Sequence, residues 1–206
     1  GINLEDISSP RCFEIEERLQ DIGIPVFHDD QHGTAIVVLA AMMNFCKLTG
    51  RKMEDLRVVV NGAGAAGIAI SKYIAKKDIE TKNQRIVKDI IVCDSVGIIS
   101  KGREDLNSVK KNLLEFTNKE NFEGSIFDAI RHADVFIGVS KAELLNRNDI
   151  RTMEKDPLIL ALANPVPEIL PDEAYEGGAF VVGTGRSDYP NQVNNVLAFP
   201  GIFLGA

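Results

Sequence analysis

The sequence predicts an α/β fold, a doubly wound (Rossmann-like), mostly parallel sheet with helices on both faces. Runs of almost wholly apolar residues recur along the chain, as in strands that are buried on both faces. Helical patterns separate these runs, which favours βαβ units. A glycine-rich turn follows the first run directly, as in doubly wound folds that bind a nucleotide. The five predicted strands are residues 56–60, 89–94, 133–140, 157–165 and 179–185.

The first fifty residues predict a short helix, a short strand and a long helix. Residues 13–22 carry apolar side chains at helical spacing. Residues 24–29, "IPVFHD", are typical of a strand with a proline at its edge. A mostly apolar, buried helix is expected from about residue 33 to residue 48, ended by Gly50. The opening decapeptide, "GINLEDISSP", is polar and predicts a loop.

The remaining segments are less regular. A helix is expected over about residues 65–76, after the first buried run. The polar residues 95–123 predict loop and exposed helix, and helical patterns of about ten to fifteen residues are expected between the later strands. The chain stops at "FPGIFLGA" without a helical pattern. We therefore expect a piece of a longer polypeptide.

Composition limits the classes of function. The chain has 206 residues, which suits one substantial domain, and 45% hydrophobic content is ordinary for a soluble protein. The net charge of −7 and the lack of basic runs argue against nucleic-acid binding. The longest apolar run, residues 35–43, is too short to span a bilayer, so no membrane partner is expected. Cys12, Cys46 and Cys93 lack CxxC spacing and predict reduced thiols in a cytoplasmic protein.

The motif GxGxxG is formed by Gly62, Gly64 and Gly67, between a predicted strand and a predicted helix. The first glycine would make the tight turn and the second would let backbone approach a pyrophosphate. The third would allow close packing of helix on strand, with the phosphates at the helix N-terminus. The alternative is a glycine turn without a ligand. The predicted dinucleotide site also includes the residues between these glycines: Ala63, Ala65 and Ala66.

Asp94 ends the next predicted strand, where an acid can accept hydrogen bonds from the adenosine ribose. It lies 27 residues after Gly67 (94 − 67), farther than the usual spacing of about 20, and the insertion "IETKNQRIVK" accounts for the difference. The alternative is a solvated acid. An acid here favours NAD, but Ser95, Lys101 and Arg103 could accommodate a 2′-phosphate. The choice between NAD and NADP stays open.

Two pairs of adjacent acids precede the long helix. Glu5 and Asp6 lie in one predicted loop, and Asp29 and Asp30 lie in another. Oxygen ligands from two loops suit Mg²⁺ or Mn²⁺. The alternatives are helix caps or solvated loops. Two like charges this close cost free energy unless a positive charge lies near them.

Two histidines, His28 and His32, flank the second acid pair. Their spacing does not secure the ligand geometry of a zinc site. We interpret them as packing or hydrogen-bonding residues.

Amides gather near the predicted ends of the last two strands. Asn164 follows "LALA", and the segment "TGRSDYPNQVNN" is a polar loop. In a doubly wound sheet, ligands bind at the carboxyl ends of the strands. Amides there could orient a substrate carboxylate without adding charge. The alternative is turn chemistry, which these residues also favour.

In combination, these motifs resemble the NAD(P)-binding portion of malic enzyme, particularly its bacterial and archaeal form. The matching segments run across nearly the whole chain in the order of the family: "INLEDI", "IPVFHDDQHGTA", "VVVNGAGAAGIAI", "ADVFIGVS", "LALANPVPEI" and "TGRSDYPNQVNNVLAFPGI". The resemblance makes residues 1–206 one NAD(P)-binding domain, in which residues 1–34 carry the metal-binding loops.

The resemblance implies roles for individual residues. Glu5, Asp6 and Asp30 match the ligands of a divalent metal. Asp29 matches a catalytic acid that holds a lysine in place. The matches to substrate amides are Asn164, Asn194 and Asn195, and the matches to the dinucleotide site are Gly62, Gly64, Gly67, Asp94, Ser140 and again Asn164.

The implied reaction is the oxidative decarboxylation of (S)-malate to pyruvate and CO₂ with reduction of NAD(P)⁺. Hydride leaves C2 of malate, CO₂ leaves while the metal stabilises the enolate, and an acid protonates the enol. In the family, the general-base lysine and the acid tyrosine lie in an upstream domain, and C-terminal helices follow. Tyr73, Tyr175 and Tyr189 fall in the wrong places for that acid.

We therefore expect this chain alone to bind dinucleotide and, weakly, metal, and to lack turnover of malate. Because the lysine that Asp29 would face is missing, we also expect a poorly ordered loop at Asp29 and Asp30 in the absence of metal. A homo-oligomer, dimer or higher, is expected for the full-length protein. The alternatives are a malolactic or oxaloacetate-decarboxylating variant of the same site and a non-catalytic module that senses dinucleotide.

Overall fold

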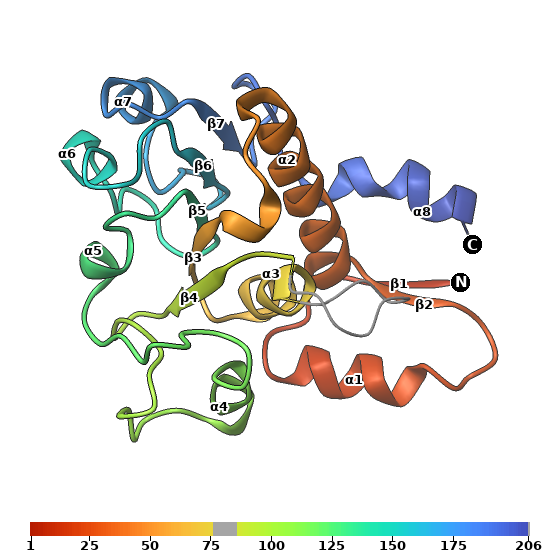
Figure 1. Cartoon of the computed structure of the whole chain (residues 1–206). Helices are drawn as coiled ribbons and strands as arrows, with labels where there is room; N and C mark the ends of the chain where they lie inside the picture. Colours follow the sequence, from red (N-terminus) through yellow and green to blue (C-terminus); the bar gives the residue numbers. More distant parts are fainter. Residues whose placement is uncertain (76–85, 206) are drawn as a thin grey trace.

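The structure, a computed structural model, describes residues 1–75 and 86–205. Its main sheet has five parallel strands in the order β4-β3-β5-β6-β7 (Figure 1). They are β3 (Arg57–Asn61), β4 (Asp89–Cys93), β5 (Val135–Gly138), β6 (Leu158–Ala161) and β7 (Val181–Thr184). All five predicted strands are confirmed. Each is one to four residues shorter than predicted at one or both ends, except β3, which begins and ends one residue later.

The strand order reverses between β3 and β5. From β3 the chain crosses to β4 on one side, and after β4 it returns to the other side of β3 to form β5. Val58 of β3 pairs with Ile90 of β4 and with Val135 of β5, so the carboxyl ends of the three strands lie together. Such a reversal opens a crevice beyond the strand ends.

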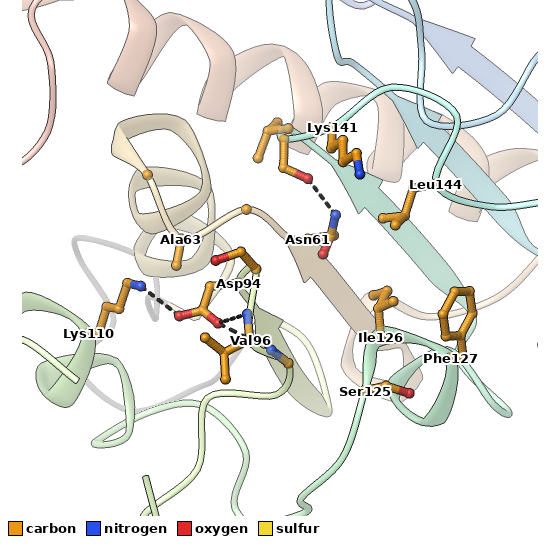
Figure 2. Close-up of a pocket in the computed structure, with 16 residues that line it drawn as sticks. Asn61, Ala63, Asp94, Val96, Lys110, Ser125, Ile126, Phe127, Lys141 and Leu144 are labelled. Atoms are coloured by element: carbon orange, nitrogen blue, oxygen red, sulfur yellow. Dashed lines mark hydrogen bonds and ion pairs between the residues drawn. The ribbon is translucent and has the colours of Figure 1, made fainter. Parts of the chain in front are cut away.

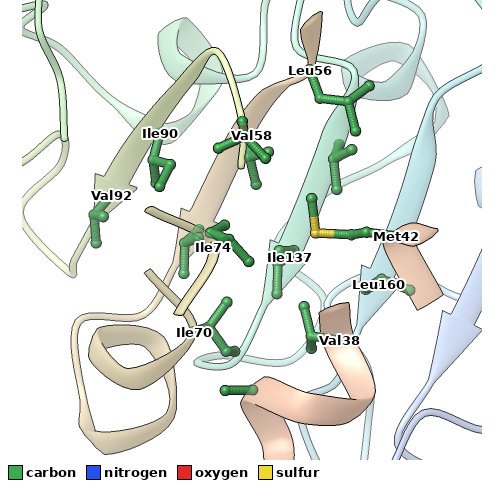
Figure 3. Close-up of a cluster of buried hydrophobic side chains, with 14 of the residues drawn as sticks. Val38, Met42, Leu56, Val58, Ile70, Ile74, Ile90, Val92, Ile137 and Leu160 are labelled. Carbon is green, nitrogen blue, oxygen red and sulfur yellow. The ribbon is translucent and has the colours of Figure 1, made fainter. Parts of the chain in front are cut away.

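Helices cover both faces of the sheet, as predicted. One face packs against α2 (Thr34–Thr49) and α3 (Ala65–Ala75), where Val58 and Ile137 meet Met42 and Ile74 in the larger core (Figure 3). The other face carries Val59 and Phe136. It is covered by the short helices α5 (Ile126–Ala129), α6 (Arg147–Ile150) and α7 (Pro171–Glu176). Alternation of side chains along buried strands produces these two cores.

The helices between the later strands are shorter than predicted. α5, α6 and α7 have four to six residues. Polar caps start α5 and α6, whereas α7 starts with Pro171, and a turn ends each helix soon afterwards. In the polar middle of the chain, the helix is α4 (Ser108–Leu113). The predicted end of the helix at residue 76, and most of the insertion before Asp94, lie outside the described residues.

The N-terminal segment differs from the prediction. β1 (Ile2–Leu4), expected as loop, pairs in parallel with β2 (Val26–His28) in a separate two-stranded sheet. Between them lies α1 (Arg11–Leu19). The predicted loop at Asp29 and Asp30 is a wide helical turn, η1 (Asp29–Gly33), that continues directly into α2.

α2 ends at Gly50, whose φ of 72° lies in the left-handed region. The prediction that this helix is buried holds only for one of its sides, because Met43 and Leu48 are exposed. Together η1 and α2 form a helical stretch that is long and apolar enough, by length and composition, to cross a membrane. A core helix passes the same test, and Val38, Met42 and Phe45 of α2 lie in the core.

The end of the chain is helical, contrary to the sequence prediction. A short turn, η3 (Asn195–Ala198), leads into α8 (Phe199–Gly205), which extends away from the sheet (Figure 1). Phe199 packs on Phe27 of β2 and stacks on Phe203. The helix has these aromatic contacts, although its sequence lacks a periodic apolar pattern.

Candidate functional site

A crevice of about 650 Å³ lies at the reversal of strand order (Figure 2). Its walls are the segments that follow three strands: residues 61–64 after β3, residues 94–97 after β4 and residues 139–141 after β5. The start of α5 and the side chain of Lys110 close it. Its size suits a large cofactor.

The glycine motif forms the turn from β3 into α3, and its three glycines differ in their surroundings. Gly62 has φ of +124°, and a Cβ there would press on Val139. A Cβ on Gly67 would overlap the carbonyl oxygen of Gly62, which explains the close approach of α3 to the turn. A Cβ on Gly64 would meet nothing within 4 Å, so Gly64 leaves open space in the crevice. The turn fits a pyrophosphate as the motif predicts.

Asp94 lines the crevice, as predicted, but its carboxylate has partners that the prediction did not include. Arg103 donates to both of its oxygens, at 2.8 and 3.0 Å. Lys110 donates to Oδ2 at 2.6 Å (Figure 2). The backbone N–H of Val96 donates to Oδ1 at 2.9 Å. Burial alone would raise the pKa of Asp94, but the hydrogen bonds from Arg103 and Lys110 hold it well below its usual range.

These partners bear on the recognition of the coenzyme. The carboxylate of Asp94 already accepts several hydrogen bonds, whereas an acid that binds the ribose needs free acceptor positions. Lys110, unlike Arg103, lines the crevice. Lys110 thus places a cation in the wall of the crevice, beside Asp94. The choice between NAD and NADP stays open on this geometry.

A second, polar cavity of about 240 Å³ adjoins the crevice, with which it shares Val139 and Ser140. Asn164, Asn194 and Asn195 line it, so the structure brings the three predicted amides together. It also includes Ala66 of α3 and Thr34 of α2. Ala65 lines neither cavity.

The three amides have different local tasks. Asn194 caps η3, accepting from the backbone N–H of Val196 at 3.0 Å. Asn195 donates through Nδ2 to Oδ2 of Asp29 at 2.5 Å. This hydrogen bond joins residues 166 positions apart and ties the acid-bearing turn to the amide cavity. Asn164 lies in the cavity wall, beside Ala163.

Asp29 is buried, with an exposed fraction of 1%. Its Oδ1 has no hydrogen-bond partner among the described residues, and a Cβ on Gly33 would overlap this atom. Burial raises the pKa of Asp29, against the hydrogen bond from Asn195, and the neighbouring charge of Asp30 raises it further. The carboxylate is thus held in place with one oxygen left for a further donor or cation.

The acid segment, defined here as residues 1–6 and 26–33, brings together two of the other predicted metal ligands, Asp6 and Asp30. Leu4 of β1 is level with His28 of β2, and the backbone N–H of Asp6 donates to Oδ2 of Asp30 at 2.8 Å. Among the described residues, however, no three acidic, histidine or cysteine side chains form a group that could hold a metal. The chemistry of the donors fits a divalent ion, whereas a preformed cage is not present in the part of the chain described.

The two histidines behave differently from each other. His32 Nε2 lies 2.5 Å from Oε1 of Glu16, and Gln31 donates to Oε2 of the same glutamate at 3.1 Å. His28 is fully buried, and its ring nitrogens have no hydrogen-bond partner among the described residues. The prediction of hydrogen bonding is confirmed for His32 and that of packing for His28.

A family model described as malic enzyme, NAD binding domain, matches residues 31–206. The chain belongs to the malic enzyme family. It is 57% identical over 208 residues to the bifunctional malic/malolactic enzyme of Bacillus subtilis, covering 100% of this chain and 49% of that protein. It is 49% identical over 209 residues to the NADP-dependent malic enzyme of Haemophilus influenzae, covering 100% of this chain and 26% of that protein.

Solved malic enzymes share the fold. The NAD-dependent malic enzyme of Thermotoga maritima superposes with a TM-score of 0.91 at 49% identity, covering 100% of this chain and 53% of that chain. This malic enzyme chain therefore spans about half, or less, of the length of the relatives that it matches. Both kinds of coenzyme occur in the names of relatives, so the domain is an NAD(P)-binding domain of malic enzyme.

Sequence reasoning missed four residues that shape the sites of this malic enzyme domain. Lys110 and Glu16 lie on predicted helices, where charged residues are ordinary, and nothing in the pattern distinguishes them. Asn61 ends β3 and donates to the hydroxyl of Ser140 at 2.5 Å. Glu168 is fully buried beside the strand ends. A polar residue directly after an apolar strand was the available signal for Asn61, as it was for Asn164.

Proposed function

We propose that this chain supplies the coenzyme and metal sites of an enzyme that converts (S)-malate to pyruvate and CO₂ and reduces NAD(P)⁺. The observation that carries the proposal is the hydrogen bond from Asn195 to Asp29. It places a buried carboxylate beside the amide cavity, which itself adjoins the glycine-rich crevice. Groups suited to a dinucleotide, a small polar substrate and a cation thus lie next to one another.

The residues of the chain divide the work. Gly64 leaves room for the pyrophosphate at the start of α3, and Ser140 borders both cavities. Asn164 and Asn195 offer amide donors to a substrate carboxylate or hydroxyl. When bound, the oxidised dinucleotide supplies the hydride acceptor, and Mg²⁺ or Mn²⁺ supplies Lewis-acid polarisation of the substrate oxygens.

Glu5, Asp6 and Asp30 would hold the divalent ion. Asp30 is already hydrogen-bonded to the backbone of Asp6, which keeps the two loops together. Asp29 would orient a cationic group, because one of its oxygens is free and buried. A lysine from outside the chain is the cationic group that the family resemblance implies.

The general acid of the reaction also has no candidate here. The tyrosines Tyr73, Tyr175 and Tyr189 line neither the crevice nor the amide cavity in the part of the chain described. Residues 1–206 alone would therefore bind dinucleotide without turning over malate. The full-length protein would act in the cytoplasm, and we propose a homo-oligomer.

The test is steady-state activity of the full-length protein with malate and Mn²⁺, with NAD compared against NADP. We expect pyruvate and reduced coenzyme in equal amounts. Absence of both products, with coenzyme binding intact, would favour the non-catalytic module that senses dinucleotide.

A second candidate is a malolactic variant of the same site, which the name of the Bacillus subtilis relative favours. Lactate formed from malate without net NADH would identify it. Release of CO₂ from oxaloacetate but not from malate would instead identify a decarboxylating variant.

The metal proposal has its own test. Mn²⁺ binding is followed by electron paramagnetic resonance for the wild type and for Asp30→Asn, with Asp21→Asn as the control, since Asp21 is an exposed acid outside the acid segment. We expect Asp30→Asn to weaken Mn²⁺ binding at least tenfold and Asp21→Asn to leave it unchanged. Equal affinity in all three proteins would refute a role for Asp30.

A further inference from the structure

Glu168 is a fully buried acid whose carboxylate bridges two strand ends. Its Oε1 accepts from the backbone N–H of Ser140, just beyond β5, at 3.0 Å. Its Oε2 accepts from the backbone N–H of Ala163, just beyond β6, at 3.0 Å. The exposed fraction of Glu168 is 0%. One side chain thus accepts hydrogen bonds from two backbone N–H groups that lie beyond the ends of the strands.

The surroundings leave space for this carboxylate and little else. A Cβ on Gly138, the last residue of β5, would overlap the carboxyl group of Glu168. The backbone carbonyl of Glu168 accepts from the N–H groups of Leu144 at 2.7 Å and Leu145 at 3.0 Å. Both the side chain and the backbone of Glu168 are therefore fixed against the segment that follows β5.

The bridged residues line the cavities. Ser140 borders the crevice and the amide cavity, and Ala163 lines the amide cavity beside Asn164. The hydroxyl of Ser140 also accepts from Asn61 at the end of β3. The ends of β3, β5 and β6 are thereby linked through Asn61, Ser140 and Glu168.

The buried charge has no cationic partner among the described residues. Burial raises the pKa of Glu168, and only backbone N–H groups oppose this shift. The charged residues on the neighbouring segments are Lys141 and Glu143 after β5, Arg186 and Asp188 after β7, and Asp172 and Glu173 on α7; none of them shifts the pKa of Glu168. Loss of either hydrogen bond would therefore leave a buried polar group without a partner, which costs free energy.

We propose that Glu168 is a positioning residue for the coenzyme site, which sets the backbone of Ser140 and Ala163 at the wall shared by the crevice and the amide cavity. The inference rests on the proposed binding of NAD(P) in the crevice. Glu168 lines neither cavity, so it acts through Ser140 and Ala163 and not by contact.

A glutamine cannot replace the carboxylate in this role. Its side chain has the same length, but it offers one acceptor oxygen and one NH₂ group. One of the two backbone N–H groups would face the NH₂ donor and lose its partner. A hydrogen bond to a charged group carries enough free energy for about a tenfold change in an equilibrium.

The experiment compares Glu168→Gln with Glu143→Gln in the full-length protein, by fluorescence titration with NADH and NADPH. Glu143 is an exposed acid in the segment that follows β5, so its substitution removes the same charge without breaking the bridge. We expect Glu168→Gln to bind the preferred coenzyme about tenfold more weakly and Glu143→Gln to bind it as the wild type does. Circular dichroism establishes that both variants are folded.

A pH profile separates positioning from a general loss of stability. The folded-state pKa of Glu168 is raised, so protonation of this group favours the folded state, and its stability contribution is lost as pH rises through that pKa. Protonation also removes an acceptor from the bridge. The raised pKa lies above 4.5, the ordinary value. As pH falls through it, the wild type should lose affinity for coenzyme relative to Glu168→Gln. Over the same range, the protonation of Glu168 favours the folded state.

The outcomes are distinct. If the wild type binds no coenzyme, the proposed function is wrong and this inference falls with it. If the wild type binds and folded Glu168→Gln binds equally well, the inference alone is wrong. If Glu168→Gln does not fold, the wild-type profile decides: a loss of affinity on acidification within that pH range supports the bridge, and a flat profile refutes it.

Discussion

The coenzyme crevice and the acid segment are built in opposite ways. In and behind the wall of the crevice, buried polar groups are paired: Asp94, which lines it, accepts from Arg103 and Lys110. Glu168, which lies behind the wall, accepts from two backbone N–H groups. In the acid segment, both ring nitrogens of His28 and Oδ1 of Asp29 are buried without a hydrogen-bond partner among the described residues.

This difference indicates which site is complete within the chain. Buried polar groups in proteins are nearly always paired, so an unpaired one calls for an explanation. The crevice needs nothing further for its own stability. The acid segment leaves Oδ1 of Asp29 without a partner, and this is the atom to which the proposed cationic group would bind.

The largest expected effect comes from Gly67→Ala, which breaks the crevice. The new Cβ would overlap the carbonyl oxygen of Gly62, a backbone atom that cannot move aside cheaply. We expect a loss of at least about 3 kcal/mol in the free energy of unfolding, measured by urea titration. Gly64→Ala is the control, because its Cβ meets nothing within 4 Å; it should keep the stability and weaken coenzyme binding.

The next effect comes from Asp94→Asn, which removes a paired charge from the crevice. Arg103 and Lys110 would lose their shared partner, and the free energy of unfolding at neutral pH should fall by roughly 3 kcal/mol. The control is Asp188→Asn, since Asp188 makes a similar pair with Arg186 at the surface, where little stability is at stake.

The pH dependence of that loss has a definite sign. The folded-state pKa of Asp94 lies below its unfolded value of 3.8, so the stability that it contributes is present above this value and is lost as pH falls through the folded-state pKa. The difference between wild type and Asp94→Asn should therefore shrink on acidification below pH 3.8. A difference that stays constant down to the acid transition would contradict the ion pairs.

The smallest expected effect has the opposite sign and sharpens the comparison. Asp29→Asn replaces a buried carboxylate, with one unpaired oxygen, by a neutral amide that can still accept from Asn195. Without metal, we expect a gain of about 1 kcal/mol in the free energy of unfolding and a loss of malate turnover in the full-length protein. Asp30→Asn should give no such gain, because Asp30 is paired with the backbone of Asp6. A loss of stability in Asp29→Asn would contradict the cost ascribed to the unpaired, buried oxygen of Asp29.

The sheet could be predicted from the sequence because its strands are buried on both faces, which leaves continuous apolar runs such as "VVV" in β3 and "IIVC" in β4. The glycine turn could be predicted because its motif, GxGxxG, is also a local pattern in the sequence. β1 and η1 could not be predicted, since their formation depends on partners 24 or more residues away, such as the pairing of Leu4 with His28. α8 likewise accompanies contacts of Phe199 rather than a helical repeat.

The sequence predicts which residues lie at the candidate site better than it predicts the partners of these residues. The strand-end positions of Asp94 and Asn164 follow from topology, and both lie where expected. The partners of Asp94 do not, because Lys110 reaches it from a helix 16 residues later. Glu168 was missed since a glutamate in a proline-rich turn gives no sign of burial, and the space for it comes from Gly138 on another strand.

The direct passage from η1 into α2 gives the acid pair a fixed angular setting. Each residue of an α-helix turns the chain by about 100°, so neighbours on a helix point in different directions. Asp29 turns inward to Asn195 while Asp30 turns toward Asp6. Because α2 is anchored in the core, the insertion or deletion of one residue between the acids and Val38 would rotate both carboxylates away from their partners. The number of residues between the acid pair and the core is therefore fixed by the two hydrogen bonds that the carboxylates make.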